Sequence, residues 1–495
     1  MNTSRLLESE FAREMEGFYV PWTGAKVPEP RLLRFNRALA DELGLPTGFE
    51  TRADAARLLA GVESAEGASP LAMVYAGHQF GQFSPQLGDG RALLIGEVID
   101  RDGRRRDIHL KGSGPTPFSR RGDGKAVLGP VLREYLIGEA MHALGIPTTR
   151  ALAVVTTGET IYRDALLPGA VLARVAASHL RVGTFEFFAA RRDHARLKQL
   201  ADYALRRHYP HLAARDDRYL ALLGAVTERQ ARLIAQWMLV GFIHGVMNTD
   251  NMAISGETID YGPCAFMDRY HPETVFSSID HQGRYAYGNQ PRIAVWNLAR
   301  FAESLLPLIS PDDPEQAVGP ATEMLDRFGG LYRAEWLAGM RAKLGLARED
   351  EQDRALAGRL LELMAEHGAD YTSLFRRLAE AVSGDGESVV AALGGGMEAR
   401  NMEARAWLLG WRERLATETI APAEISARMN RINPLYIPRN HRVEAALDDA
   451  YAGNMATFDA LLAALQSPFE ARPGMEALGG PAPATDGPYR TFCGT

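Results

Sequence analysis

The segment HGVMNTDNMAISGETIDYG, residues 244–262, places three metal-type ligands close together along the chain. Met252–Ile254 and Thr258–Ile259 are short β-prone runs, and Ser255-Gly256 between them is a candidate two-residue turn. If that turn closes a tight hairpin, Asn251 lies opposite Asp260 with Cα atoms roughly 4.5–5.5 Å apart. The pattern therefore predicts an amide oxygen and a carboxylate held side by side.

Oxygen ligands at that separation suit Mg²⁺ or Mn²⁺, hard cations that usually arrive with substrate phosphates. Asp250 stands next to this pair and could orient or deprotonate a hydroxyl. The segment thus indicates a metal and phosphate site. His244 at its start is as well explained by packing or loop bracing, so it is not assigned to the site.

The composition is typical of a globular protein, and the chain is too long for one small hydrophobic core. The chain has 495 residues, 46% hydrophobic and 24% charged, so two lobes or domains are expected. A formal net charge of −7 argues against a general nucleic-acid binder. Two cysteines, Cys264 and Cys493, make neither a disulfide scaffold nor a zinc site.

The N-terminal residues predict neither export nor membrane insertion. Residues 1–19 lack an apolar signal-peptide core, and they are too acidic for a transit peptide. No run approaches the ~18 apolar residues that a membrane helix needs. We therefore expect a cytoplasmic protein without a membrane partner.

Residues 1–70 are expected to form a helical lead-in, with a helical pattern over residues 32–43.

A glycine-rich loop and two strands follow. Leu93–Ile99 and Asp107–Leu110 are strand-like around an Asp102-Gly103 turn. The preceding loop, Gly88-Asp89-Gly90-Arg91, could lie close against a phosphate because glycine leaves backbone amides open. An ordinary turn between strands is the alternative.

A lysine and a glutamate follow that invite an ion pair. Lys111 ends the second strand, and Glu134 lies one turn into a helix expected over Val131–Leu144. Such a pair would aim the lysine at a phosphate, although a solvated lysine and a surface glutamate have the same spacing. The loop between them carries Asp123-Gly124 and several cations.

Two further arginines occur near the next strands, which are expected over residues 151–155, 160–163 and 170–175. Arg174 lies in an otherwise apolar strand and Arg181 follows seven residues later. Together they could neutralise a polyphosphate, or they could be unrelated surface residues.

The remainder is mainly helical. Thr227-Glu-Arg-Gln230 matches a capping box that would open an apolar helix. Residues 263–292 form a long irregular segment, which is typical of functional or mobile loops. The chain divides into a lead-in (1–70), a glycine-loop lobe (71–182), a helical lobe with the catalytic hairpin (183–466) and a Pro/Gly-rich tail (467–495).

The order of these parts resembles a protein kinase: phosphate loop, Lys–Glu pair, catalytic loop and metal-binding Asp-Tyr-Gly. Several kinase signatures are absent. The loop is QLGDGR rather than G-x-G-x-x-G, Asp250 and Asn251 are adjacent, and there is no A-P-E.

The departures are specific, and over nearly the whole chain the sequence resembles the selenoprotein O family, also called YdiU. The motifs that carry the resemblance are YAGHQFGQFSPQLGDGRA, HLKGSGPTPFSR, GVMNTDNM, DYGPCAFMD and IDHQGRYAYGNQP. The resemblance implies an α+β, protein-kinase-like two-lobed fold: a mixed β/α N-lobe and a mainly helical C-lobe with a C-terminal extension. It also implies transfer of AMP from flipped ATP to protein Ser, Thr or Tyr hydroxyls.

Site residues follow from the motif positions. Asp250 matches the proton acceptor, Asn251 and Asp260 match the Mg²⁺ or Mn²⁺ ligands, and Glu134 matches the lysine's partner. The expected nucleotide contacts are Gly88, Gly90, Arg91, Lys111, Asp123, Gly124, Arg174, Arg181 and Asp260. The family further suggests a redox-labile disulfide between Cys264 and Cys493, since cytosolic disulfides are usually transient or regulatory.

Alternatives stay open. An attack at the α-phosphorus is indifferent to the base, so UTP with Mn²⁺ could give uridylylation. An ordinary phosphotransferase and a non-catalytic nucleotide-binding scaffold are also conceivable. Retention of Lys111, Asp250, Asn251 and Asp260 argues against the scaffold, which has no need of all four.

Overall fold

The computed structural model describes residues 6–395, 397–483 and 489–492, and combines an antiparallel sheet with many helices. The sheet follows the order β1-β3-β6-β7-β10-β9-β2, and β8 pairs with β10. The strands span Tyr19–Pro21 (β1), Arg31–Phe35 (β2), Leu71–Met73 (β3), Ala92–Ile99 (β6), Arg105–Lys111 (β7), Ala126–Val127 (β8), Arg150–Tyr162 (β9) and Leu166–Ala176 (β10). A separate hairpin joins β4 (Gly77–Gln79) to β5 (Gln82–Ser84).

The centre of the sheet agrees with the sequence pattern. β6 and β7 pair around Asp102-Gly103, where Gly103 has φ +77° and the Asp100 amide donates to the Arg104 carbonyl. The predicted helix after Lys111 is α4 (Leu128–Ala143), which ends before Gly145 at φ +77°. One face of α4 packs on β9 and β10, and the other packs on α15 (Asn440–Tyr451) and α16 (Ala456–Leu465), so the helix is almost wholly buried.

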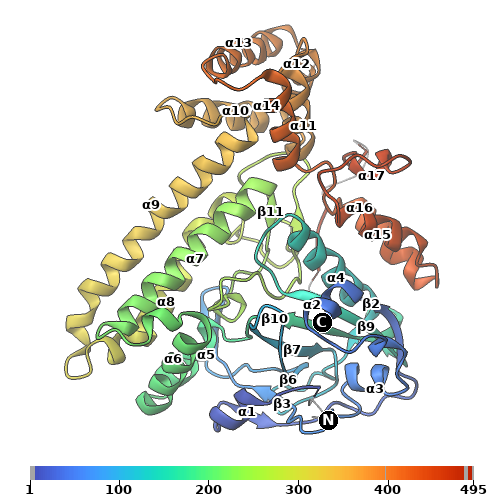
Figure 1. Ribbon diagram of the computed structural model, residues 1–495, viewed down its shortest axis with the longest axis vertical. Coiled ribbons are helices and arrows are strands. Elements are labelled where there is room, and N and C mark those ends of the chain that lie inside the picture. Colours follow the sequence, from blue (N-terminus) through green and yellow to red (C-terminus); the bar gives the residue numbers. More distant parts are fainter. Residues whose placement is uncertain (1–5, 396, 484–488, 493–495) are drawn as a thin grey trace.

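The helical part begins after β10. Three long helices, α7 (Arg218–Val240), α8 (Gln290–Ile309) and α9 (Val318–Lys343), pack side by side along one flank (Figure 1). Shorter helices α5 (Val182–Ala190) and α6 (His194–His208) lie near their ends. A further cluster lies beyond the end of α9: α10 (Asp353–His367), α11 (Tyr371–Ala381), α12 (Glu387–Gly394), α13 (Glu398–Leu415) and α14 (Pro422–Ile432).

Two local predictions were wrong. The helical pattern over residues 32–43 starts as the strand β2, which pairs with β9, and only then becomes α2 (Arg37–Glu42), capped by Asn36. The Thr227 capping box lies inside α7, which already begins at Arg218, and Thr227 is buried there. In both cases tertiary pairing and packing override a local signal.

The predicted catalytic hairpin is also wrong. Ala253 forms an isolated bridge with Arg181, and Thr258 forms one with Thr148, so the two β-prone runs pair with different segments and not with each other. The turn itself is present, with Gly256 at φ +77° and its amide donating to the Ala253 carbonyl. Strand-like runs need backbone partners, and here those partners come from distant parts of the chain.

In the ranges that the structure describes, no helix is both long and apolar enough to cross a bilayer.

Candidate active site

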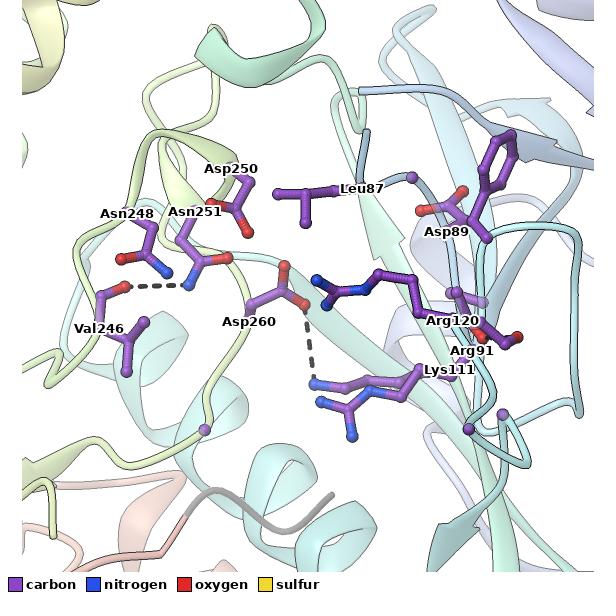
Figure 2. Close-up of a pocket in the computed structure, with 18 of the residues that line it drawn as sticks. Leu87, Asp89, Arg91, Lys111, Arg120, Val246, Asn248, Asp250, Asn251 and Asp260 are labelled. Carbon is purple, nitrogen blue, oxygen red and sulfur yellow. Dashed lines mark hydrogen bonds and ion pairs between the residues drawn. The ribbon is translucent and has the colours of Figure 1, made fainter. Parts of the chain in front are cut away.

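A cavity of about 480 Å³ lies between the sheet and the segment after α7, a size typical of small-molecule sites. Figure 2 shows Asp250 and Asn251 on one side, Arg91 and Lys111 on the other, and Asp260 between them. The cavity brings together every predicted nucleotide, metal and proton-acceptor residue, namely Gly88, Gly90, Arg91, Lys111, Asp123, Gly124, Arg174, Arg181, Asp250, Asn251 and Asp260. Glu134 is not part of this lining but forms an ion pair with Lys111.

The glycines of the loop before β6 are required by packing. Gly88 has φ +93°, and a Cβ there would lie 2.6 Å from the Phe118 ring. A Cβ on Gly90 would lie 2.8 Å from the Phe118 carbonyl oxygen. The Thr116 hydroxyl donates to the Asp89 carbonyl at 2.6 Å. The loop is therefore clamped against residues 116–119, and only residues without a side chain fit at positions 88 and 90.

The predicted ion pair between strand and helix is present. Lys111 Nζ lies 2.5 Å from Glu134 Oε2, and Arg174 Nη1 donates to Glu134 Oε1 at 3.1 Å. Lys111 also lies 3.7 Å from Asp260. Glu134 is buried on α4, so it holds two cations at the cavity wall.

Asp260 is surrounded by positive charge. Arg174 and Arg181 each donate to one of its carboxylate oxygens, and Lys111 is the third neighbouring cation. Burial alone would raise the pKa of Asp260, but these three cations hold it well below the ordinary value. Asp260 itself has φ +60°, a conformation that Asp tolerates better than most residues.

Asp250 has the opposite environment. It lies in the short 3₁₀ segment Thr249–Asn251, where Gln79 Nε2 donates to Oδ2 at 3.3 Å. The buried Oδ1 has no hydrogen-bond partner among the described residues. Burial raises the pKa of Asp250 to about 6, even though Arg181 opposes the shift. A carboxyl group that lines a cavity and has a pKa close to neutral pH is the kind of group that acts as a general base.

Asn251 has a fixed orientation. Its Nδ2 donates to the Val246 carbonyl at 2.9 Å, which leaves Oδ1 as the group facing the cavity (Figure 2). Asn251 Oδ1 and the Asp260 carboxylate are hard oxygen donors that line the same cavity, which fits Mg²⁺ or Mn²⁺. Because three cations already surround Asp260, we expect the metal to enter together with a polyanion.

Asp123 and Gly124 reach the cavity from the loop after Phe118. Asp123 forms a bidentate pair with Arg163, with both N–O distances 2.9 Å. Gly124 has φ +65°, and a Cβ there would lie 2.2 Å from the Gly114 carbonyl oxygen. Arg163, on the turn between β9 and β10, thus fixes a loop that the sequence indicated only by composition.

Sequence reasoning missed several lining residues, including Tyr75, Gln79, Phe80, Phe118 and Asn248. Gln79 and Phe80 belong to the glycine- and aromatic-rich run GHQFGQF, residues 77–83, which forms the β4–β5 hairpin and could have indicated them. A Cβ at Gly77 would lie 2.7 Å from Asp250 Oδ1, so this hairpin closes directly over the acid.

His244 and Cys264 do not line the cavity. His244 is buried, its Nε2 bonds the Ile259 carbonyl at 2.9 Å, and it therefore braces the segment before Asp260. Cys264 is buried, which raises the pKa of its thiol to about 12. Cys493 lies outside the described residues, so the Cys264–Cys493 disulfide stays a prediction.

Comparison with known proteins gives consistent matches over the chain. A family model described as "Protein adenylyltransferase SelO" matches residues 3–466. A protein from Cereibacter sphaeroides named "Protein nucleotidyltransferase YdiU" is 60% identical, covering 99% of each chain. Proteins of the same name from Chromobacterium violaceum (62% identical, 94% of this chain and 97% of that one) and Rhizobium leguminosarum bv. trifolii (57%, 97% and 95%) are similar.

Proposed function

The chain belongs to the SelO family of protein adenylyltransferases, and from that premise we propose that it transfers AMP from ATP to Ser, Thr or Tyr hydroxyls of other proteins. The observation that carries the proposal is the division of charge in the cavity. Asp250, with a pKa of about 6, stands on one wall, and Lys111, Arg174 and Arg181 gather around Asp260.

Each wall has a part in the reaction. The acceptor oxygen attacks the α-phosphorus of ATP, and Asp250 takes the hydroxyl proton as general base. The bond from the α-phosphorus to the oxygen that bridges to the β-phosphorus breaks, and pyrophosphate leaves with that electron pair. Lys111, Arg174 and Arg181 stabilise the charge that develops on this leaving group. The products are the AMP ester of the protein and pyrophosphate.

Asn251 and Asp260 would hold Mg²⁺ or Mn²⁺, which supplies further positive charge to the phosphates when bound. The loop at Gly88, Gly90 and Arg91 and the loop at Asp123-Gly124 would hold the rest of the nucleotide. Their positions on the cavity lining support this assignment.

The wider architecture is part of the proposal. We expect a protein-kinase-like, two-lobed arrangement in which residues 71–182 and 183–466 form the lobes, between a lead-in and a C-terminal tail. The antiparallel sheet carrying Lys111, the buried helix carrying Glu134 and the helical part after Arg181 support it. We also propose that the protein acts in the cytoplasm.

The position of the label in the nucleotide tests the reaction. The protein is incubated with acceptor proteins and ATP labelled at the α- or the γ-phosphorus, with Asp260→Ala as the control. Label incorporated only from α-labelled ATP supports AMP transfer, and label only from γ-labelled ATP contradicts it. Stronger labelling from α-labelled UTP with Mn²⁺ would identify uridylylation instead. Nucleotide binding without any incorporation would identify a scaffold.

A further inference from the structure

One fully buried histidine joins the glycine loop to a cavity arginine. His109 lies on β7 directly opposite Arg174 on β10, and its side chain is 0% exposed. Its Nε2 lies 3.1 Å from Asp89 Oδ2, and Arg174 Nε donates to its Nδ1 at 3.2 Å. Asp89 belongs to the Gly88–Arg91 loop, whereas Arg174 contacts Asp260. His109 itself does not line the cavity.

The hydrogen-bond partners of the His109 ring determine which of its two nitrogens carries the hydrogen. Asp89 is a buried carboxylate that already accepts the Met73 amide at 3.0 Å, so it can only accept from the ring. Nε2 therefore carries the hydrogen, and Nδ1 presents a lone pair to the Arg174 N–H. Burial lowers the pKa of His109, and nearby Arg174 lowers it further, in keeping with a neutral ring.

The result is an unbroken series of hydrogen bonds from the loop to the centre of the cavity. Asp89 accepts from His109, His109 accepts from Arg174, and Arg174 donates onward to Glu134 and Asp260. With Nε held by the ring, Nη1 of Arg174 is directed at those carboxylates. An apolar residue at position 109 would leave the Arg174 Nε–H and the Asp89 carboxylate without their buried partner, a costly arrangement.

We propose that His109 is a positioning residue: it sets the place of Arg174 relative to the Gly88–Arg91 loop, and through Arg174 it determines how tightly the polyphosphate of the nucleotide is held. The inference rests on the proposed nucleotide site. It assigns His109 no contact with substrate, because its effect passes entirely through Arg174 and Asp89.

A matched control lies against the same ring. His179 stacks on His109 with ring centroids 4.0 Å apart and an interplanar angle of 16°. It is equally buried, but its Nδ1 faces Asp107 at 3.1 Å, and it contacts neither Arg174 nor Asp89 through a hydrogen bond. His109→Phe and His179→Phe both keep an aromatic ring in the stack and remove one histidine's hydrogen bonds.

The test is a double-mutant cycle on nucleotide affinity. The dissociation constant of a non-hydrolysable ATP analogue with Mg²⁺ is measured by calorimetry for the wild type, H109F, R174K and H109F/R174K, with H179F as control. We expect H109F to weaken binding about tenfold or more in the wild-type background, and by less than about threefold when Arg174 is already Lys. H179F should lower the melting temperature but change the affinity less than about threefold.

Equal losses in both backgrounds, or an H109F affinity within about threefold of the wild type, would overturn the proposal. If H109F does not fold, His109→Leu is put through the same cycle under the same criteria. The readout is binding, so a wild type that binds the analogue but labels no protein contradicts the proposed function while leaving the test of His109 intact.

Discussion

Lys111 Nζ lies 2.5 Å from Glu134 Oε2, across 23 positions of sequence, and Glu134 also accepts from Arg174. The carboxylate thus aligns two cations at once on the cavity wall. Lys111 at a strand end and Arg174 on the neighbouring strand both depend on the negative charge of the Glu134 carboxylate for their positions.

Glu134→Gln should lower kcat/KM for the nucleotide at least about tenfold, because a neutral amide holds Lys111 and Arg174 more weakly than a carboxylate. The matched control is Glu139→Gln. Glu139 lies on the same helix, is equally buried and is bound to Arg150 at 2.8 Å, away from the cavity lining. Steady-state transfer assays should show a fall for E134Q only; equal falls would make the effect one of helix stability.

Asp250→Asn should reduce transfer by at least about a hundredfold while nucleotide affinity changes only a few-fold, because it removes a base and leaves the cationic wall in place. Asp260→Asn should instead weaken binding of the metal and nucleotide. Measuring affinity and single-turnover rate for both variants separates the two roles. Transfer by D250N at a near wild-type rate would remove Asp250 from the mechanism.

Gly88→Ala should destabilise the protein more than Gly103→Ala does. Both glycines have positive φ, +93° and +77°, so both substitutions strain the backbone by about 1 kcal/mol. Only the Cβ at position 88 meets an obstacle, the Phe118 ring at 2.6 Å, whereas position 103 has open space. We expect a further loss of about 1–3 kcal/mol for G88A in urea unfolding, together with weaker nucleotide binding.

Lys343 should make stability depend on pH. It is fully buried at the end of α9 with its Nζ 3.9 Å from the Phe375 ring centroid, and burial lowers its pKa to about 7 from 10.5. Between about pH 7 and 10.5 the unfolded chain binds more protons at Lys343 than the folded chain does. The free energy of unfolding therefore rises with pH over this range, as the cost of burying Lys343 falls.

Lys343→Met should therefore stabilise the protein at pH 7 by up to about 5 kcal/mol, less what the ring contact contributes, and the gain should shrink toward pH 10. Melting temperatures across this pH range check the prediction, with Lys198→Met on an exposed face of α6 as the control. A gain that does not change with pH would mean that Lys343 stays charged in the fold.

The Cys264–Cys493 disulfide remains a prediction with a structural consequence. The Thr491 hydroxyl, two positions before Cys493 in the sequence, donates to the carbonyl of Pro263, the residue next to Cys264, at 2.7 Å. Burial keeps the Cys264 thiol protonated, and only a thiolate reacts readily. We therefore expect slow formation under oxidant, detected by mass spectrometry of non-reduced peptides and absent in Cys264→Ser; free thiols alone after prolonged oxidation would refute it.

Local patterns were enough to place much of the site. The Asp102-Gly103 turn, Lys111 at a strand end and Glu134 on the following helix all follow from short-range periodicity and turn chemistry, and the motifs around Asp250 and Asp260 indicated the family. These features depend on neighbours within a few residues, so they are visible without the fold.

The hydrogen-bond partners and the pKa values of the site residues were decided only by the tertiary structure. The runs beside Asn251 and Asp260 pair with Arg181 and Thr148, not with each other, because backbone groups are satisfied by whichever strand lies adjacent in space. His109 lies within a predicted strand, and only the fold brings Asp89 and Arg174 within hydrogen-bond distance of its ring. Burial raises the pKa of Asp250, whereas three neighbouring cations hold the pKa of Asp260 low against the same effect. Both burial and the neighbouring cations depend on how distant segments pack, which no local pattern encodes.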